Sequence, residues 1–136
     1  MKNKAGIWID HRQAIIVFID EGASVTDKIE SGLEGHVRFT SHTSSEDGSA
    51  DDQRDSQFTE RLNRYYDEII LRVRDVEALL LFGPGEAKQE FKDRLSRNGY
   101  KGHIGGVETV DKMTEPQMVA KVRQHFHLNL SVPEAL

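Results

Sequence analysis

The stretch that decides the fold is Ala78-Leu79-Leu80-Leu81-Phe82-Gly83-Pro84-Gly85. Its apolar part is uninterrupted, too short for a typical helix, and ends at a strong turn signal. Such a run is typical of a strand that is buried on both faces, as in a parallel sheet flanked by helices. We therefore expect 78–82 to be a central strand that leads through Gly-Pro-Gly into a helix.

Apolar residues on both sides of this strand recur at helical spacing. Upstream, one stripe predicts a long helix and consists of Phe58, Leu62, Tyr65, Ile69, Val73 and Val76. Downstream, a second helix is expected to stop near Asn98-Gly99, where glycine can form a left-handed cap. A short strand over His103–Val110 follows, and Thr114-Glu115-Pro116-Gln117 has the spacing of a capping box that opens a third helix.

The first third of the chain has the composition of a sheet. Ala5–Asp10 and Gln13–Asp20 are rich in β-branched and aromatic residues, and the short polar segment between them predicts a hairpin. A third strand is expected over Ala23–Ser31, and its mixed polarity is typical of a sheet edge. Trp8 alternates with Ile7 and Ile9, so we expect it to face the opposite side and to pack under a helix.

These elements occur in the order of three strands, helix, strand, helix, strand, helix. Tight turns make the first three strands antiparallel, and the later strand–helix–strand units make parallel pairs through right-handed crossovers. The expected fold is α/β, with a five-stranded mixed sheet of order 3-2-1-4-5 and three helices, as in the ribonuclease H-like fold. Residues 1–136 form one domain in this interpretation, with a core over 5–126 and a loose tail over 127–136.

Composition excludes several classes of function. The chain has no cysteine, which excludes disulfides, thiolate metal sites and cysteine nucleophiles and fits a reducing cytoplasm. With 18 Lys and Arg against 23 Asp and Glu, the net charge is −5, so a polybasic DNA-binding protein is not expected. No apolar run is long enough to span a bilayer, and the N-terminus lacks the pattern of a signal peptide. We expect a cytoplasmic protein with no membrane partner.

Residues 36–57 interrupt the regular pattern. The segment contains almost nothing that could enter a core, and five acids fall between Glu46 and Asp55. A structureless segment of this length in a compact domain is usually a functional loop or a disordered one. We expect a mobile loop here and leave open whether it binds a partner, because clustered acids would repel RNA.

The element Phe82-Gly83-Pro84-Gly85-Glu86-Ala87-Lys88-Gln89-Glu90-Phe91 resembles a Gly-Pro-Gly-x-x-Lys-x-x-Phe element. This element occurs in the central, ribonuclease H-like domain of Pelota and of the archaeo-eukaryotic release factors. The opening hairpin, the long tyrosine-containing helix and the strand leading to Glu108-Thr109-Val110-Asp111 follow in the same order. The resemblance covers about 5–126 and implies a stand-alone, bacterial-type relative of that superfamily.

One departure from the superfamily bears on function. Release factors carry Gly-Gly-Gln in the loop before the long helix, and its glutamine promotes hydrolysis of peptidyl-tRNA. This chain has Asp47-Gly48-Ser49 and Asp52-Gln53-Arg54 there, with no Gly-Gly-Gln anywhere. Pelota also lacks the motif and still binds ribosomes. The resemblance therefore implies a non-catalytic, translation-associated protein that binds the ribosome or structured RNA.

The candidate RNA-binding residues lie in and around the loop. They are the polar and basic residues Arg12, His36, Arg38, His42, Gln53, Arg54 and Lys88. A rival hypothesis is a protein-interaction or oligomerisation module that kept the fold, with a protein partner or a homodimer, and the acidic loop favours it. A contiguous basic patch around Arg12, Arg38 and Lys88 would favour RNA, whereas a continuous acidic face would favour a protein partner.

The turn formed by Gly83, Gly85 and Lys88 has two interpretations. Exposed N–H groups at a helix N-terminus can hold a phosphate, and Lys88 lies one turn into the helix. The simpler interpretation is structural, because a buried strand needs a sharp turn into the next helix.

No metal site, cofactor or catalytic set is expected. Ribonuclease H uses a carboxylate cluster to hold magnesium ions, and here Asp10 ends the first strand and Asp67 or Glu68 lies on the first helix. A third acid would have to follow the central strand, where this chain has Gly83. The histidines are scattered along the sequence, and His125 and His127 are too close in sequence to share a helix face.

Overall fold

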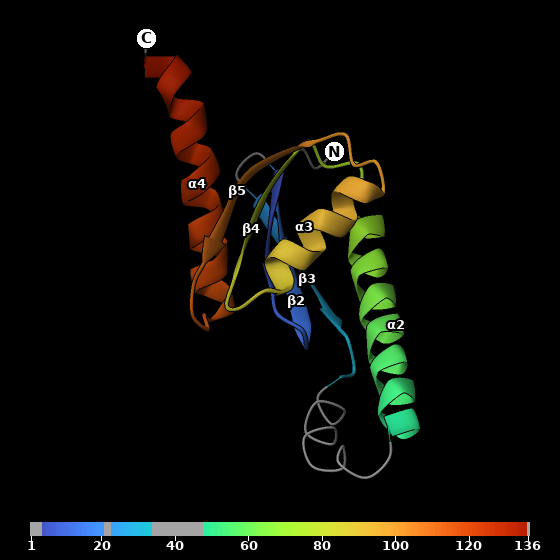
Figure 1. The fold of residues 1–136 in the computed structure, drawn as a ribbon. Coiled ribbons are helices and arrows are strands. Elements are labelled where there is room, and N and C mark those ends of the chain that lie inside the picture. Colours follow the sequence, from blue (N-terminus) through green and yellow to red (C-terminus); the bar gives the residue numbers. More distant parts are fainter. Residues whose placement is uncertain (1–3, 21–22, 34–47, 136) are drawn as a thin grey trace.

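The run of apolar residues at 78–82 lies in the centre of a five-stranded sheet (Figure 1). The computed structural model describes residues 4–20, 23–33 and 48–135. Strand β4 (Ala78–Gly83) pairs in parallel with β1 (Lys4–Ile9) on one side and with β5 (His103–Thr109) on the other. Leu79 to Phe82 are fully buried, which confirms the expected two-sided burial.

The remaining strands complete the sheet as an antiparallel meander. Strand β2 (Gln13–Asp20) pairs with β1, and β3 (Ala23–Glu30) pairs with β2. The order β3-β2-β1-β4-β5 confirms the expected mixed sheet and its edge strand. In β5 the register shifts opposite Leu79 and Leu80, at the paired glycines that weaken this strand.

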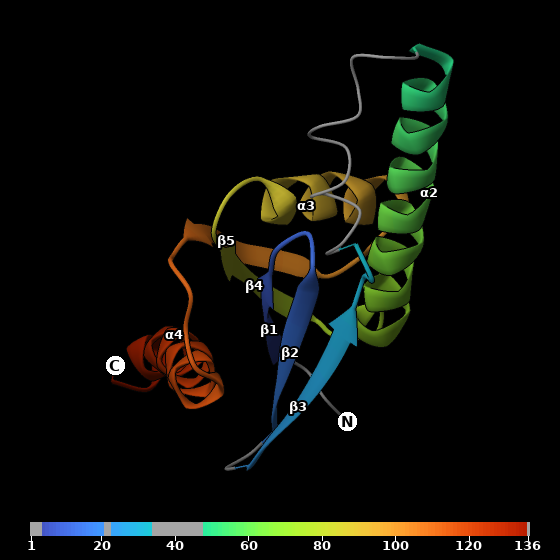
Figure 2. The ribbon, with the colours of Figure 1, turned by 90° about the horizontal axis from the view of Figure 1, so that it is seen from below.

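Helices cover both faces of the sheet (Figure 2). Helices α2 (Gly48–Val73) and α3 (Ala87–Arg97) lie on one face, and α4 (Glu115–Ala135) lies on the other. Trp8 packs with Met118, Val122 and Phe126 of α4, as its alternation with Ile7 and Ile9 predicts. The opposite core joins Ile7 and Ile9 to the tyrosines and aliphatic residues of α2 and to Phe91 and Leu95 of α3.

Two expected boundaries differ from the structure. Helix α2 begins at Gly48, so 48–57 is helical where we expected the end of the loop over 36–57. Aspartates at 51, 52 and 55 fall in its first two turns, where the helix dipole favours negative charge. Helix α4 continues through 127–135, where we expected a loose tail, and no glycine or proline lies between Phe126 and Ser131 to end it.

The predicted helix ends are confirmed at two places. The Thr114 N–H donates to Gln117 Oε1 at 2.9 Å, and the Gln117 N–H donates to Thr114 Oγ1 at 3.3 Å, which forms the capping box of α4. Helix α3 ends before Gly99, whose φ of 80° is the left-handed cap. No helix in the described ranges has both the length and the apolar character needed to cross a membrane.

The β4–α3 turn depends on its glycines. Gly83 has a φ of 148°, and a Cβ there would lie 2.3 Å from the Ile9 carbonyl oxygen. Gly85 has a φ of 68°, and a Cβ there would meet no atom within 4 Å, so its backbone angle alone favours glycine. The Val110 N–H donates to the Gly83 carbonyl at 3.1 Å, which holds the turn against the end of β5.

Candidate functional site

A pocket of about 580 Å³ lies at the carboxyl edge of the parallel strands, the lower edge of the sheet in Figure 1. The chain leaves β4 toward the α3 face and leaves β5 toward the α4 face (Figure 2), and the pocket has one lining residue from each exit, Pro84 and Lys112. Crevices of this kind, at the carboxyl ends of neighbouring strands, are the usual ligand sites of open α/β sheets. The pocket is lined by Trp8, Asp10, Arg12, Gln13, Glu30, Gly32, Pro84 and Lys112.

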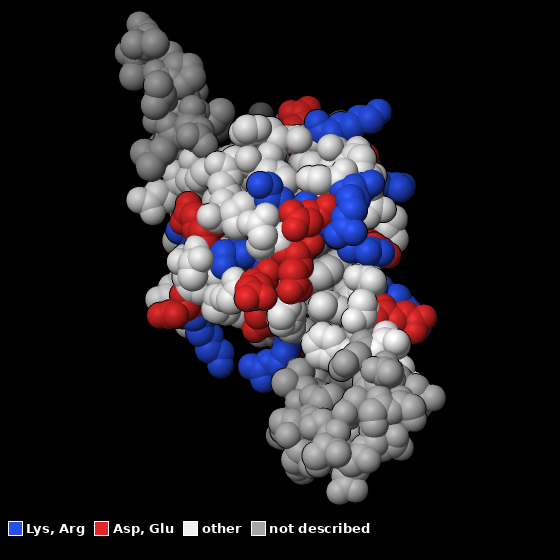
Figure 3. Space-filling view, in the orientation of Figure 1, with Lys and Arg blue, Asp and Glu red and all other residues white. Residues whose placement is uncertain are grey.

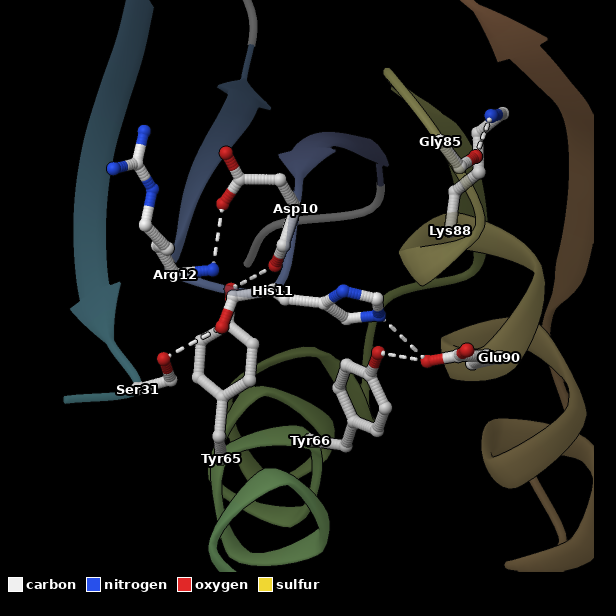
Figure 4. A network of polar contacts seen from close by, with 9 residues as sticks. All are labelled: Asp10, His11, Arg12, Ser31, Tyr65, Tyr66, Gly85, Lys88 and Glu90. Carbon is white, nitrogen blue, oxygen red and sulfur yellow. Dashed lines mark hydrogen bonds and ion pairs between the residues drawn. The ribbon is translucent and has the colours of Figure 1, made fainter. Parts of the chain in front are cut away.

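The β1–β2 turn forms one wall of this pocket and is held by its own aspartate. Asp10 Oδ1 accepts hydrogen bonds from the backbone N–H groups of Arg12 and Gln13, both at 2.8 Å. The end of β3 fixes the turn from the other side, because Ser31 N–H donates to the Arg12 carbonyl at 2.9 Å and Ser31 Oγ donates to the His11 carbonyl at 2.6 Å. The turn is therefore a defined structure that positions the side chains at its tip (Figure 4).

Two adjacent tyrosines of α2 support the turn from below. Tyr65 Oη donates to the Asp10 carbonyl at 2.8 Å, and Tyr66 Oη donates to Glu90 Oε1 at 2.8 Å. The same Glu90 oxygen lies 2.9 Å from His11 Nε2, so the turn is joined to both α2 and α3. Burial raises the pKa of both tyrosines far above the ordinary value, and the neighbouring Glu90 raises that of Tyr66 further. Both phenols are therefore neutral donors at physiological pH.

The charged side chains of the pocket differ in how far they are paired. Arg12 and Lys112 are exposed, and neither forms an ion pair with any residue in the described ranges. Glu30 forms an ion pair within β3, with its Oε2 3.5 Å from Lys28 Nζ. The pocket thus presents two cations without an ion-pair partner among the described residues, together with the second carboxylate oxygen of Asp10 and the amide of Gln13.

Of the candidate RNA-binding residues that the structure describes, only Arg12 lines this pocket. Lys88 is only 6% exposed, and its Nζ donates to the Gly85 carbonyl at 2.6 Å, away from Arg12 (Figure 4). The first turn of α3 places the Lys88 side chain over the Gly-Pro-Gly turn, so Lys88 and Arg12 do not form one contiguous basic patch (Figure 4). This contact favours the structural interpretation of the turn over the anion-binding one.

The other candidates either fall outside the described residues or belong to α2, and none of them is among the residues that line the pocket. His36, Arg38 and His42 fall outside the described residues. Gln53 and Arg54 lie in the first two turns of α2 rather than in a loop.

Lys112 and the tyrosine pair were not identified from the sequence as parts of this edge. Lys112 follows β5, and a residue that follows a parallel strand next to the central one is a recognisable signal for such a site. Tyr65 was identified as part of an apolar stripe, which is correct for its ring. The hydrogen bonds of the two phenol groups depend on the packing of α2 against the hairpin, which the helical spacing does not determine.

The acids at this edge form no metal site. Asp10 follows β1 as the nuclease hypothesis requires, but Gly83 ends β4, and no cluster of three metal-ligating side chains occurs in the described part of the chain.

A second hollow, of about 400 Å³, lies between α2 and α3. Arg94 lines this hollow and joins α3 to α2. Its Nε donates to Asp67 Oδ1 at 2.7 Å, and its Nη2 donates to Asp67 Oδ2 at 3.0 Å. These bonds lower the pKa of Asp67 below its ordinary value. Acidic side chains gather over α3 on the same side of the molecule (Figure 3), including Glu86, Glu90 and Asp93.

Several solved structures have a fold similar to that of this chain. The chain superposes on Thermoplasma acidophilum Pelota with a TM-score of 0.59 and 14% identity, over 90% of this chain and 32% of that one. Archaeoglobus fulgidus Pelota gives a TM-score of 0.50 and 12% identity, over 98% of this chain and 38% of that one. An archaeal translation termination factor, aRF1, gives 0.48 and 16% identity, over 96% of this chain and 41% of that one. No family model matches the sequence, and the search of curated proteins found no significant match.

These similarities show that the chain has the fold of part of Pelota, as the sequence resemblance implies. The chain spans about a third of the length of the Pelota proteins that it matches.

Proposed function

We propose that this chain is a translation-associated protein that binds the ribosome or structured RNA and does not release peptides. The observation that carries this proposal is the similarity in fold between 90% of this chain and Thermoplasma acidophilum Pelota, with a TM-score of 0.59. Gly-Gly-Gln does not occur in the sequence, so hydrolysis of peptidyl-tRNA is not part of the proposal.

The carboxyl edge of the sheet is the surface that supports RNA binding best. Arg12 stands at the tip of a turn that is held by Asp10, Ser31 and Tyr65, and its guanidinium has no carboxylate partner among the described residues. An unpaired arginine is suited to phosphate because its planar N–H groups match two phosphate oxygens. Lys112 adds a second cation at the same edge.

Co-sedimentation with ribosomes tests the proposal. We expect the purified protein to move with ribosomal particles at low salt and to be released progressively as the salt concentration rises, because phosphate contacts depend on counterion release. Arg12→Gln should weaken this association, whereas Arg74→Gln, at the opposite edge of the sheet between α2 and β4, should not. A protein that stays at the top of the gradient at every salt concentration would refute the proposal.

The rival function, a protein-interaction module, is favoured by a different surface. Acidic side chains gather near the middle of the face shown in Figure 3, with Lys and Arg side chains around them, and clustered acids repel nucleic acid. A basic protein partner is the chemistry that this face would suit. A pull-down from cell extract with and without nuclease treatment separates the two functions, since a partner captured through RNA is lost after nuclease and a partner bound to α3 is kept.

A further inference from the structure

We propose, building on the RNA-binding function above, that the pocket at the carboxyl edge holds one nucleotide of a single-stranded RNA segment. Arg12 and Lys112 bind the phosphate, and Asp10 accepts a hydrogen bond from the ribose 2′-hydroxyl. The pocket then gives the protein a preference for RNA over DNA.

The phosphate position follows from the two cations. Arg12 belongs to the β1–β2 turn and Lys112 to the segment after β5, so they approach the crevice from two separate parts of the fold. The segment that carries Lys112 is anchored beneath, because the Trp8 indole N–H donates to the Asp111 carbonyl at 3.4 Å. Two cations on separately anchored segments of one pocket, neither paired with an acid of the described ranges, favour a ligand with a negative group.

The hydroxyl position follows from Asp10. One oxygen of its carboxylate is used by the backbone of the turn, through two hydrogen bonds of 2.8 Å. The carboxylate and the Arg12 guanidinium lie on the side of the turn that faces away from Tyr65 and Tyr66 (Figure 4). The second carboxylate oxygen is an acceptor without a hydrogen, so it suits a ligand group that donates, such as a hydroxyl.

A nucleotide satisfies both requirements at once, whereas simpler anions do not. An inorganic anion or an acidic peptide would bring negative charge close to Asp10 and Glu30, which is unfavourable. A ribonucleotide separates its phosphate from its hydroxyl donors, so the cations and the carboxylate can each have a complementary group. The volume of about 580 Å³ falls within the usual range of small-molecule sites. The 2′-hydroxyl is also the group by which proteins tell RNA from DNA.

The test uses the full chain and its single tryptophan. Trp8 lines the pocket and is 2% exposed, so the resonance of its indole N–H reports directly on occupancy. We would titrate the protein with a single-stranded oligouridylate, with the oligodeoxyuridylate of equal length and with inorganic phosphate. The expected result is a shift of the Trp8 resonance with the RNA oligomer, at an affinity about three- to tenfold above that of the DNA oligomer.

Matched variants separate the two contacts. Arg12→Gln and Lys112→Gln should each lower RNA affinity by about tenfold and reduce the slope of log K against log salt by about 0.7, the value for one phosphate contact with a single strand. Arg74→Gln and Lys101→Gln, at the opposite edge of the sheet, are the controls and should leave both quantities unchanged. Asp10→Asn keeps the oxygen that holds the turn, and should reduce the preference for RNA over DNA to about one.

The outcomes distinguish this inference from the function on which it rests. RNA or ribosome binding without a shift of Trp8, or with equal losses in the pocket and control variants, would overturn the pocket and leave the proposed function standing. A shift of Trp8 with equal affinity for RNA and DNA would overturn the role of Asp10. Saturation by inorganic phosphate at the affinity of the oligomer would overturn the assignment to a nucleotide. No binding of RNA and no association with ribosomes would overturn the proposed function itself.

Discussion

The β4–α3 turn and the β1–β2 turn lie side by side at the carboxyl edge of the sheet. Each has a cationic residue: Lys88 follows the first turn, and Arg12 is part of the second. Lys88 of the first is buried and donates to the Gly85 carbonyl, whereas Arg12 of the second is exposed with no charged partner among the described residues. A residue in the first turn of a packed helix is directed back over its own turn, and a residue at a hairpin tip is directed outward. The backbone around a cation therefore decides whether it stabilises the fold or meets a ligand.

The largest effect is expected from a change in the β4–α3 turn. Gly83→Ala would place a Cβ 2.3 Å from the Ile9 carbonyl oxygen, at a residue whose φ is 148°. The clash is with the backbone of β1, which cannot shift without disturbing its pairing in the sheet. We expect a loss of about 3–5 kcal/mol in the free energy of unfolding and a fall in Tm of about 10–20 °C. Gly85→Ala, which meets no atom within 4 Å, should lose only about 1–2 kcal/mol. Equal losses in the two variants would contradict the close approach at Gly83.

The next effect concerns the support of the β1–β2 turn. Tyr65→Phe leaves the Asp10 carbonyl without its phenol donor, so we expect a loss of about 1–2 kcal/mol in urea unfolding and weaker RNA binding as the turn loosens. Tyr66→Phe is the matched control, because Glu90 keeps its contact with His11. Its loss of stability should be smaller and its RNA affinity unchanged. Identical RNA affinities for the two variants would show that the turn needs no support from Tyr65.

A crossed pair of variants tests the comparison of the two cations directly. Lys88→Met removes the hydrogen bond to Gly85 but keeps most of the buried stem, and should cost about 1 kcal/mol of stability with RNA affinity unchanged. Arg12→Gln should change stability by less than about 0.5 kcal/mol and weaken RNA binding. Thermal unfolding and RNA titration on both variants give the four values. Weaker RNA binding by Lys88→Met alone would reverse the assignment and restore the anion-binding turn.

The smallest effect is a pH dependence at the contact between α2 and α3. Arg94 lowers the pKa of Asp67, so the contribution of this pair is present above the ordinary value of 3.8 and is lost as the pH falls through the lower value of the folded state. Because Asp67 is half exposed, we expect a difference of less than about 1 kcal/mol between the wild type and Arg94→Gln at pH 7, and a smaller one below about pH 3. Arg64→Gln, which removes an exposed arginine from its pair with Glu60, is the control for the loss of one positive charge on α2.

Sequence reasoning worked best where one physical pattern determined the answer. The apolar run at 78–82, its breakers and the polar turn after β1 were sufficient for the buried parallel strand and the opening hairpin. The order of the strands followed from the likeness of this arrangement to the ribonuclease H-like fold. Sequence reasoning failed for residues 48–57, where poor apolar content suggested a loop, although a helix that projects beyond its core needs no buried face there.

The candidate site was harder to predict than the fold. Arg12 was identified because it lies in an expected turn. Lys88 has the same charge and also lies close to an expected turn, so the sequence did not distinguish the two residues. The burial of Lys88 follows from the angle at which α3 leaves β4, which sequence spacing alone does not specify. Lys112 becomes part of the pocket only because β5 and β1 both flank β4.

The hydrogen bonds that hold the β1–β2 turn have a consequence for the speed and entropy of recognition. Asp10, Ser31 and Tyr65 restrict the backbone at Arg12 before any ligand arrives. Ordering a flexible loop on binding consumes part of the interaction free energy, and a turn that is already ordered avoids most of this loss. The turn therefore needs only a change of side-chain rotamers to engage its ligand, so its association rate should be limited by diffusion and electrostatic attraction and not by loop folding.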